Sequence, residues 1–114
     1  MAKHPKFEIY QGNNDKLFFR LTAKNGQPIL SSQGYADKGG CKNGIESVRK
    51  NAPDDSRYER KDASDGRKYF NLLAANQQVI GTSQMYKSAE GCDKGINSVK
   101  RNAPNAEIDD TTGA

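Results

Sequence analysis

The strongest constraint on this chain is an internal duplication. The stretch GGCKNGIESVRKNAP returns fifty-one positions later as EGCDKGINSVKRNAP, with Cys, Gly, Ile, Ser, Val, Asn, Ala and Pro in the same places. At that offset, residues 7–53 align with residues 58–104 without a gap. Such a repeat is one supersecondary unit used twice. The sequence therefore predicts a single domain of two repeats, with residues 54–57 as a linker and residues 105–114 as a polar tail.

The first half of each repeat has the pattern of β-strands. Apolar residues alternate with polar or aromatic ones in FEIY and LFFRLTAK, and QPILSSQ follows as a third strand. Before this third strand, Asn25-Gly26 supplies two residues that tolerate positive φ, which predicts a type I′ turn. The second repeat keeps the strands in KYFNLLAA and QVIGTSQ. It has Gln77 in place of the glycine, so its turn either carries strain or takes another form.

The second half of each repeat has the 3.6-residue period of a helix. Asp37 and Ser88 stand at equivalent positions ahead of it, where a side-chain oxygen can accept from the free amides of a first turn. The motif Asn-Ala-Pro is expected to end both helices, because proline cannot continue the hydrogen bonding. One apolar stripe runs along each helix: Cys41, Ile45, Val48 and Ala52 in the first, and Cys92, Ile96, Val99 and Ala103 in the second.

Neither repeat has enough apolar residues to be stable alone. A strand-and-helix unit of about 47 residues buries too little surface to offset the loss of chain entropy. The two repeats should therefore share one core. The predicted fold is α+β: one antiparallel sheet built from both halves, with both helices on one face and a pseudo-twofold axis between the repeats.

The order of these segments resembles the YegP-like family of uncharacterised bacterial proteins, in its duplicated subfamily. FEIY, FRLTAKNGQPIL, SQGY and GIESVRKNAP, followed by YFNLLAANQQVIGTSQMY and GINSVKRNAP, carry the resemblance over roughly residues 7–104. It implies tandem β-β-β-α-β units in one sheet, with the C-terminal strand of each unit exchanged into the other half. RYERKD would then be both the strand that follows the first helix and the first strand of the second unit. AEIDD would form the last strand. The resemblance implies no activity, cofactor or catalytic residues.

Composition and charge limit the class of protein and its cellular location. Of its 114 residues, 33% are apolar and 28% are charged, which is typical of a polar globular domain. The net charge is +4 and the pI is near 9.1. No apolar run is long enough to span a bilayer, and the N-terminus lacks the hydrophobic segment of a signal peptide. These features predict a cytoplasmic monomer with two reduced cysteines and a weak attraction for polyanions.

Cys41 and Cys92 are candidates for thiol chemistry. At the first turns of their helices they could form thiolates, but a nucleophilic cysteine needs a base, and the one histidine, His4, lies near the N-terminus. Burial as small apolar residues is the favoured interpretation. Gly44 and Gly95 follow the cysteines by three residues. They predict a close approach of helix and sheet, since glycine inside a helix costs about 1 kcal/mol relative to alanine.

A nucleic-acid surface is a second hypothesis. Phe18, Arg20 and Tyr69 alternate away from the predicted core, together with Tyr10, Thr22 and Asn71, and their rings and charge suit stacking on bases and contact with phosphates. Four cations close the two helices and could contact a phosphate backbone: Arg49, Lys50, Lys100 and Arg101. The alternatives are structural, namely cross-strand pairing in the sheet and compensation of the helix dipoles. Tyr35 and Tyr86 are interpreted as packing residues between strand and helix.

No catalytic, metal or cofactor site is predicted. The sequence has no zinc-ligand spacing and no serine or cysteine triad. Gly39-Gly40 and Gly91 lack the lysine-serine or lysine-threonine pair that follows a phosphate-binding loop. We therefore expect a non-catalytic protein that binds a protein partner through its surface. Weak nucleic-acid binding without sequence specificity is the alternative, and thiol or other catalytic activity is the third hypothesis.

Overall fold

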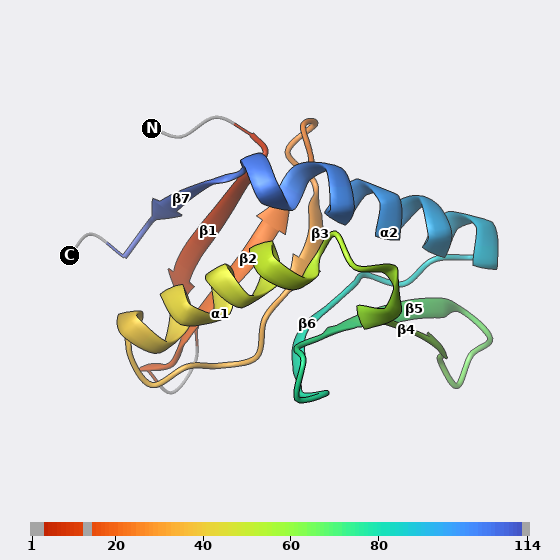
Figure 1. Ribbon diagram of the computed structural model, residues 1–114, viewed down its shortest axis with the longest axis horizontal. Helices are drawn as coiled ribbons and strands as arrows, with labels where there is room; N and C mark the ends of the chain where they lie inside the picture. Colours follow the sequence, from red (N-terminus) through yellow and green to blue (C-terminus); the bar gives the residue numbers. More distant parts are fainter. Residues whose placement is uncertain (1–3, 13–14, 113–114) are drawn as a thin grey trace.

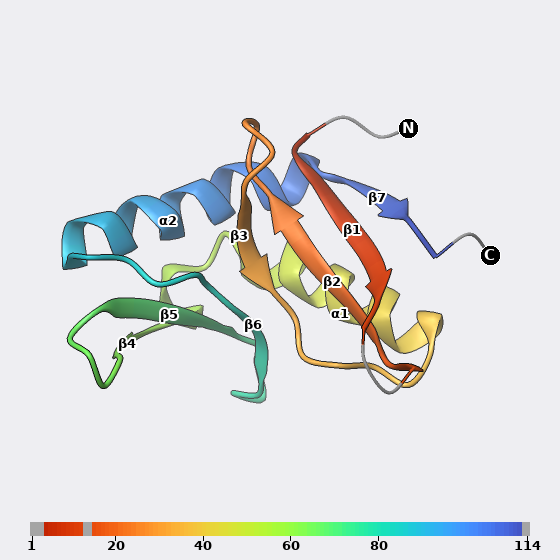
Figure 2. The same cartoon turned by 180° about the vertical axis from the view of Figure 1, so that it is seen from behind.

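Seven strands form one sheet in the order β4-β5-β6-β3-β2-β1-β7, and both helices cover the same face of it (Figure 1). Figure 2 shows the molecule from the strand side. The computed structural model describes residues 4–12 and 15–112. The strands are β1 (Lys6–Gln11), β2 (Leu17–Thr22), β3 (Pro28–Ser31), β4 (Tyr58–Asp62), β5 (Lys68–Leu73), β6 (Val79–Thr82) and β7 (Glu107–Asp110); the helices are α1 (Lys38–Asn51) and α2 (Ala89–Asn102), with short 3₁₀ turns η2 (Asp55–Arg57) and η3 (Ala103–Asn105). The predicted α+β fold is confirmed.

The helices begin and end where the sequence predicts. The Asp37 side chain accepts a hydrogen bond from the Gly40 amide at 2.7 Å, and Ser88 Oγ accepts one from the Gly91 amide at 3.1 Å. Each cap satisfies one of the free amides of a first turn. Each α-helix ends at the asparagine of its Asn-Ala-Pro motif. Both predicted caps and both predicted ends are therefore confirmed.

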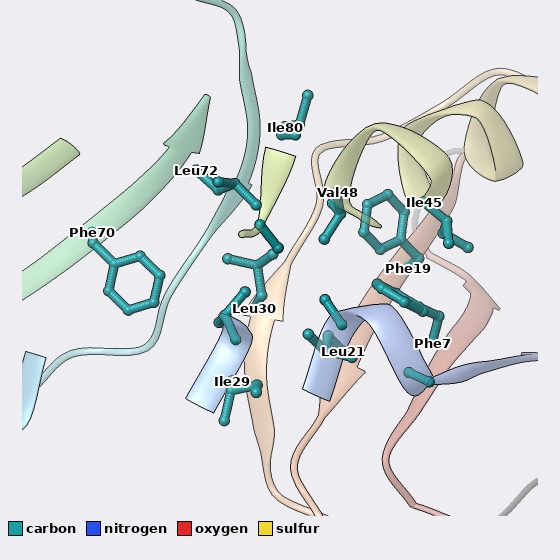
Figure 3. Packing of buried hydrophobic residues seen from close by; sticks show 14 of the residues in the cluster. Phe7, Phe19, Leu21, Ile29, Leu30, Ile45, Val48, Phe70, Leu72 and Ile80 are labelled. Carbon is teal, nitrogen blue, oxygen red and sulfur yellow. The ribbon is translucent and has the colours of Figure 1, made fainter. Parts of the chain in front are cut away.

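One hydrophobic core joins the two repeats. All the apolar stripe residues of α1 and α2 are at most 2% exposed, and they belong to a single cluster with the buried residues of the strands. Figure 3 shows Leu30 between the two halves of this cluster, with Phe19 and Leu21 on one side and Phe70 and Leu72 on the other. The shared core is confirmed, because no repeat buries its own strands and helix separately.

The prediction of a purely antiparallel sheet is wrong at one edge. β7 runs parallel to β1, with Lys6 opposite Glu107 and Phe7 opposite Ile108, whereas every other pairing of named strands is antiparallel. The reason is the position at which the chain leaves α2 and η3. The first residue of β7 lies beside the first residue of β1, so the two strands have to run in the same direction. The sheet is therefore mixed.

The exchange of C-terminal strands occurs in one direction only. β7 follows the helix of repeat two and pairs with β1, the first strand of repeat one, as expected. The residues of repeat one that correspond to β7 are residues 56–59, and they form the end of η2 and the start of β4. Since α1 ends at Asn51 and β4 begins at Tyr58, the chain enters β4 directly and has no spare segment to pair with it. Of the segment RYERKD, Arg57 ends η2 and the remaining five residues form β4, which pairs only with β5 among the described residues.

The two hairpin turns have the same shape, and it is not the predicted type I′ turn. In the first turn the Gly26 amide donates to the Ala23 carbonyl, and only Gly26 has positive φ, at 85°. This is a three-residue loop whose last residue is left-handed. In the second turn the Gln77 amide donates to the Ala74 carbonyl, and Gln77 has φ of 70°. The second turn therefore differs from type I′ and still places Gln77 at a strained positive φ.

Replacing Gln77 with glycine should raise the free energy of unfolding by about 0.5 to 1 kcal/mol. Glycine adopts left-handed angles without the Cβ clash that glutamine pays, and this gain exceeds the entropy that glycine adds to the unfolded chain. Urea denaturation would measure it. Gln78→Gly is the matched control, because Gln78 does not have positive φ and should lose stability instead. A loss in Gln77→Gly would contradict the strain.

The two repeats meet along the seam between β3 and β6. This seam is narrow, because Ser31 and Thr82 form its one registered pair. The pseudo-twofold axis relates Leu30 of β3 to Gly81 of β6. The two residues contact each other: a Cβ added to Gly81 would lie 2.7 Å from Cγ and Cδ2 of Leu30. One leucine fills the space at the axis, and the missing side chain of its symmetry mate makes room for it.

Candidate functional site

The two edges of the sheet differ, and the β1 edge is closed by β7. Lys6 Nζ donates to Asp109 at 2.7 Å, and Lys38 Nζ forms an ion pair with Asp110 at 2.8 Å. Ile108, the residue before these two aspartates, is partly buried against the core. β7 is therefore held by its backbone ladder, one apolar side chain and two carboxylates that each meet a lysine.

The surroundings of Asp110 stabilise its ionised form. The ion pair with Lys38 and hydrogen bonds from Thr112 hold the pKa of Asp110 well below its usual range. The hydrogen bond to Asp109 raises the pKa of Lys6, and the nearby Glu8 adds to this effect. The contacts of Asp110 hold the last strand only while that carboxylate is ionised.

The Asp110→Asn variant should lose about 1 kcal/mol of unfolding free energy at pH 7. A depressed carboxylate pKa stabilises the fold above the unfolded pKa of about 3.9, and the stabilisation is lost as the pH falls through the folded pKa. The wild-type and variant stabilities should therefore converge below pH 4. Urea denaturation between pH 7 and pH 2 would measure the difference, and a constant difference down to pH 2 would contradict this role of Asp110.

The opposite edge of the sheet, β4, has no strand beside it in the described part of the chain. We call Tyr58–Asp62 the open edge. The repeat offset relates Arg60 of β4 to Ile9 of β1. The Ile9 carbonyl accepts from the Thr111 amide at 2.9 Å, so the backbone groups of Ile9 face β7. Because the amide and carbonyl of one strand residue point to the same side, those of Arg60 should face outward from the open edge.

A groove of about 260 Å³ lies beside the open edge, on the side of the helices. Its lining residues come from β4, β5 and the start of α2: Arg60, Lys61, Asp62, Lys68, Ala89 and Cys92. Arg60 Nε donates to Asp93 of α2 at 2.8 Å, and both side chains are about half exposed. At the β1 edge, Cys41 corresponds to Cys92 and lies near Asp110. Burial raises the pKa of the Cys41 thiol, and the charge of Asp110 adds to this effect.

Both cysteines are core residues with free thiols. Cys41 is fully buried and Cys92 is 2% exposed. Burial raises the pKa of Cys41 to about 11, and burial also raises the pKa of Cys92, against the opposing effect of Arg60. A thiol with a raised pKa is a poor nucleophile at neutral pH. The geometry favours packing over thiol chemistry.

The helix-end cations divide into two kinds. Arg49 of α1 donates to the Ala106 carbonyl after α2 at 2.6 Å, and Lys100 of α2 donates to Asp55 after α1. Each of these two side chains thereby ties its helix to the segment that leaves the other helix. They also lie over aromatic rings, those of Phe7 and Tyr58 respectively. The remaining two, Lys50 and Arg101, are exposed on the helix surface.

The aromatic and basic residues of the sheet face pair with one another. Phe18 stacks on Tyr10 with ring centroids 5.7 Å apart, and Arg20 lies 4.8 Å above the Tyr10 ring while pairing with Glu8 at 2.7 Å. Tyr69 lies on β5, which β3 and β6 separate from β2. These residues alternate with core residues, so they face away from the helices and their cations. Nucleic-acid binding stays a prediction, with its two sets of residues on opposite sides of the sheet.

Two other residues predicted on the sheet face have structural partners. Thr22 is not exposed as predicted: it is 1% exposed, because the chain before β1 covers it. Its Oγ1 lies 2.7 Å from His4 Nδ1 and accepts from the Lys6 amide at 3.1 Å. Asn71 accepts from Thr82 Oγ1 at 2.8 Å in a cross-strand pair. Cross-strand pairing therefore accounts for both positions.

Tyr35 and Tyr86 pack between strand and helix, as predicted. The Tyr35 ring stacks on Phe19 at 6.1 Å, and the Tyr86 ring stacks on Phe70 at 6.4 Å. Gly44 makes room for Tyr35, since an added Cβ would lie 2.8 Å from its Cζ. The close approach inferred from the helix glycines is thus confirmed, with a tyrosine ring as the nearest neighbour.

The structure was also compared with the requirements of a metal site and of a membrane-spanning helix. Within residues 4–12 and 15–112, no three His, Cys, Asp or Glu side chains gather where a metal ion could be held. No helix among those residues has the length and apolar character needed to cross a membrane. The β4 edge and its groove are the candidate functional site.

The model of a family described as a domain of unknown function, DUF1508, matches the sequence twice, at residues 13–59 and 63–110. The chain belongs to the DUF1508 family. Each match ends in the strand that follows a helix, at the second residue of β4 and the last residue of β7. The start of β4 and β7 are thus corresponding parts of the DUF1508 unit, which agrees with the one-way strand exchange.

Relatives and solved structures agree with this membership. The chain is 58% identical over 102 residues to the "UPF0339 protein in ptx operon 5'region" of Stutzerimonas stutzeri, covering 90% of this chain and 92% of that protein. The solution NMR structure of YegP from Escherichia coli, a protein of unknown function, is 46% identical, with a TM-score of 0.90 over 100% of this chain and 97% of that one. The UPF0339 protein SO3888 from Shewanella oneidensis, also solved by NMR, is 47% identical, with a TM-score of 0.86 over 92% and 89%.

The resemblance to the YegP-like family is therefore confirmed, and with it the tandem repeat. DUF1508 proteins are uncharacterised, so membership brings no activity, substrate or catalytic residue to this chain.

Sequence reasoning missed the open edge, although the repeat alignment contains a signal for it. A strand position that is apolar in repeat one, Ile9, is charged in repeat two, Arg60. A helix position that is basic in repeat one, Lys38, is alanine in repeat two, Ala89. Such paired departures from repeat symmetry mark the place where the surroundings of the two repeats differ.

Proposed function

We propose that this protein is a non-catalytic, cytoplasmic, monomeric interaction module that binds a partner protein by adding one strand of the partner to the open edge. The observation that carries the proposal is the inequality of the two edges. β7 closes the β1 edge, and the related position beside β4 is empty of chain in the described residues. Strand addition to a free edge is a common mode of peptide recognition.

The backbone of β4 supports this mode of binding. The outward amide and carbonyl groups of an edge strand form a ready ladder for another strand. Main-chain hydrogen bonds give affinity in such complexes, and pockets for alternate side chains give specificity. The groove beside Arg60 lies where the alternate side chains of an added strand would reach.

The absence of catalytic features supports a binding role. The cysteine thiols are buried and their pKa values are raised, and the described residues show no metal cluster. Arg49, Lys100 and Arg20 already have structural partners. Both end strands of the sheet, β4 and β7, have an outer side without a strand partner in the described residues, and the open edge differs from β7 in having the groove beside Arg60.

Photo-cross-linking in the bacterium that encodes the chain would test the proposal. A photoreactive residue at Lys61, on β4, should capture a partner through an extended segment that mass spectrometry can locate. The same residue at Lys94, exposed on α2, is the matched control. Arg60→Pro removes an outward amide, which an edge strand tolerates, and should abolish capture at Lys61. Capture that is unchanged by Arg60→Pro in a folded variant would contradict strand addition.

A further inference from the structure

We infer that the strand bound by the open edge carries an apolar residue followed by two acidic residues, as β7 does in Ile108-Asp109-Asp110, and belongs to a partner protein. This inference rests on the proposed function and specifies the chemistry of the partner. It follows from a comparison of the cations at the two edges.

The closed edge shows what a bound strand needs in this fold. Asp110 of β7, on the helix side, meets Lys38 at the start of α1. Asp109 meets Lys6, the first residue of β1. Ile108, between Glu107 and Asp109, packs beside the core. An added strand is therefore held by one cation on each side of the sheet and one apolar contact.

The open edge also has a cation on the helix side of the sheet, but the strand carries it instead of the helix. In repeat two the helix position of Lys38 is Ala89, and the strand position of Ile9 is Arg60. Lysine on the helix and isoleucine on the strand are exchanged for alanine on the helix and arginine on the strand. The Arg60 guanidinium reaches Asp93 on α2, so it lies over the groove between strand and helix. An acidic side chain in that groove would meet Arg60 as Asp110 meets Lys38.

The second cation is also kept. Arg57 directly precedes Tyr58, as Lys6 directly precedes Phe7. Its Nε is buried and forms an ion pair with Asp54 at 3.6 Å, but it has no hydrogen-bond partner among the described residues. Buried donors of this kind cost free energy unless they are paired. A carboxylate at the position corresponding to Asp109 would supply a partner.

The charges of β4 also argue against other occupants. Every residue of the open edge after Tyr58 is charged, and charged edges resist pairing with apolar strands. In an antiparallel pair of two β4 strands centred on Arg60, the two arginines would face each other, which is unfavourable. An acidic strand would not face the arginine with a like charge, and its residue corresponding to Asp109 would lie opposite Glu59, as Asp109 lies opposite Glu8. The apolar residue of that strand would lie beside Tyr58, as Ile108 lies beside Phe7.

Peptide titration of the full chain, labelled with ¹⁵N, tests the inference. The probe is NAEIDDTT, the sequence of residues 105–112, and the matched control is its neutral form NAQINNTT. NAEIDDTT should shift and protect the amides of Tyr58 and Arg60 and should bind at least about tenfold more tightly than the neutral form, because charge-assisted hydrogen bonds are the stronger kind. Arg60→Gln, which keeps the backbone ladder, should abolish this preference. Asp93→Asn, which removes a competing carboxylate, should strengthen binding of NAEIDDTT.

The outcomes separate this inference from the proposed function. Equal binding of both peptides at β4 would overturn the acidic preference while supporting strand addition. No binding of NAEIDDTT, or shifts confined to β1 through displacement of β7, would overturn the inference, and the cross-linking experiment would still decide the proposed function. A dimer in sedimentation that Arg60→Pro dissociates would assign the open edge to a second copy and overturn the inference of a separate partner.

Discussion

Replacing Gly81 with leucine is expected to lower the free energy of unfolding by about 3 kcal/mol, as forced overpacking of a core does. Even a Cβ at Gly81 would lie 2.7 Å from two carbons of Leu30, which is 1% exposed in the core. The strands that carry them, β3 and β6, are joined through one registered pair, so the seam between the repeats would open first. Urea denaturation monitored by circular dichroism would measure the loss.

The pseudo-twofold axis provides a sharp control for this prediction. Leu30→Gly alone should destabilise the protein through a cavity, by several kcal/mol. The double variant, with Leu30→Gly and Gly81→Leu, moves the leucine across the axis to the related position. It should recover most of the stability that either single change loses. Losses that simply add in the double variant would show that the two positions do not share one space.

Replacing Gly44 with leucine is expected to cost about 3 kcal/mol for a different reason. An added Cβ at Gly44 would lie 2.8 Å from Cζ of Tyr35 and 3.0 Å from Cε2 of Phe19. These stacked rings have to move before α1 can hold its place on the sheet. Gly95→Leu should behave alike, because a Cβ there would lie 2.6 Å from Cζ of Tyr86. Thermal unfolding should show a midpoint several degrees lower in both variants.

A control in the same helix separates packing from helix propensity. Gly39 lies in the first turn of α1, and an added Cβ would meet only Asp37 Oδ1, at 3.5 Å. Gly39→Ala should therefore keep or raise stability, since alanine favours a helix over glycine by about 1 kcal/mol. If Gly44→Leu left the midpoint unchanged, the tyrosine packing would have no part in the need for glycine.

The helices could be predicted from the sequence because their signals are local. The stripe that begins at Cys41, the caps at Asp37 and Ser88, and the Asn-Ala-Pro ends all lie within a few residues of the bonds they control. The shared core could also be predicted, because the apolar residues of one repeat are too few for that repeat alone. The family resemblance added the exchange of C-terminal strands, which the structure shows for β7 and β1 only.

The turns and the edges could not be predicted in the same way. Asn25-Gly26 is compatible with more than one hairpin loop, and the bond from Gly26 to Ala23 selects one of them. The candidate site was missed because an open edge is a property of the whole sheet. From the sequence alone, Arg60 is an exposed strand residue. Only the sheet order shows that β4 has no strand beside it, whereas β1 has β7.

By itself, the sequence determined the duplication, the order of strands and helices, and the apolar stripes, because each depends on spacing along the chain. Only the tertiary structure decided that β7 runs parallel to β1, that Leu30 alone fills the space at the axis, and that β4 stays open. These features depend on where α1 and α2 deliver the chain in space. The short linker leads directly into β4, whereas the tail after α2 is free to pair with the opposite repeat.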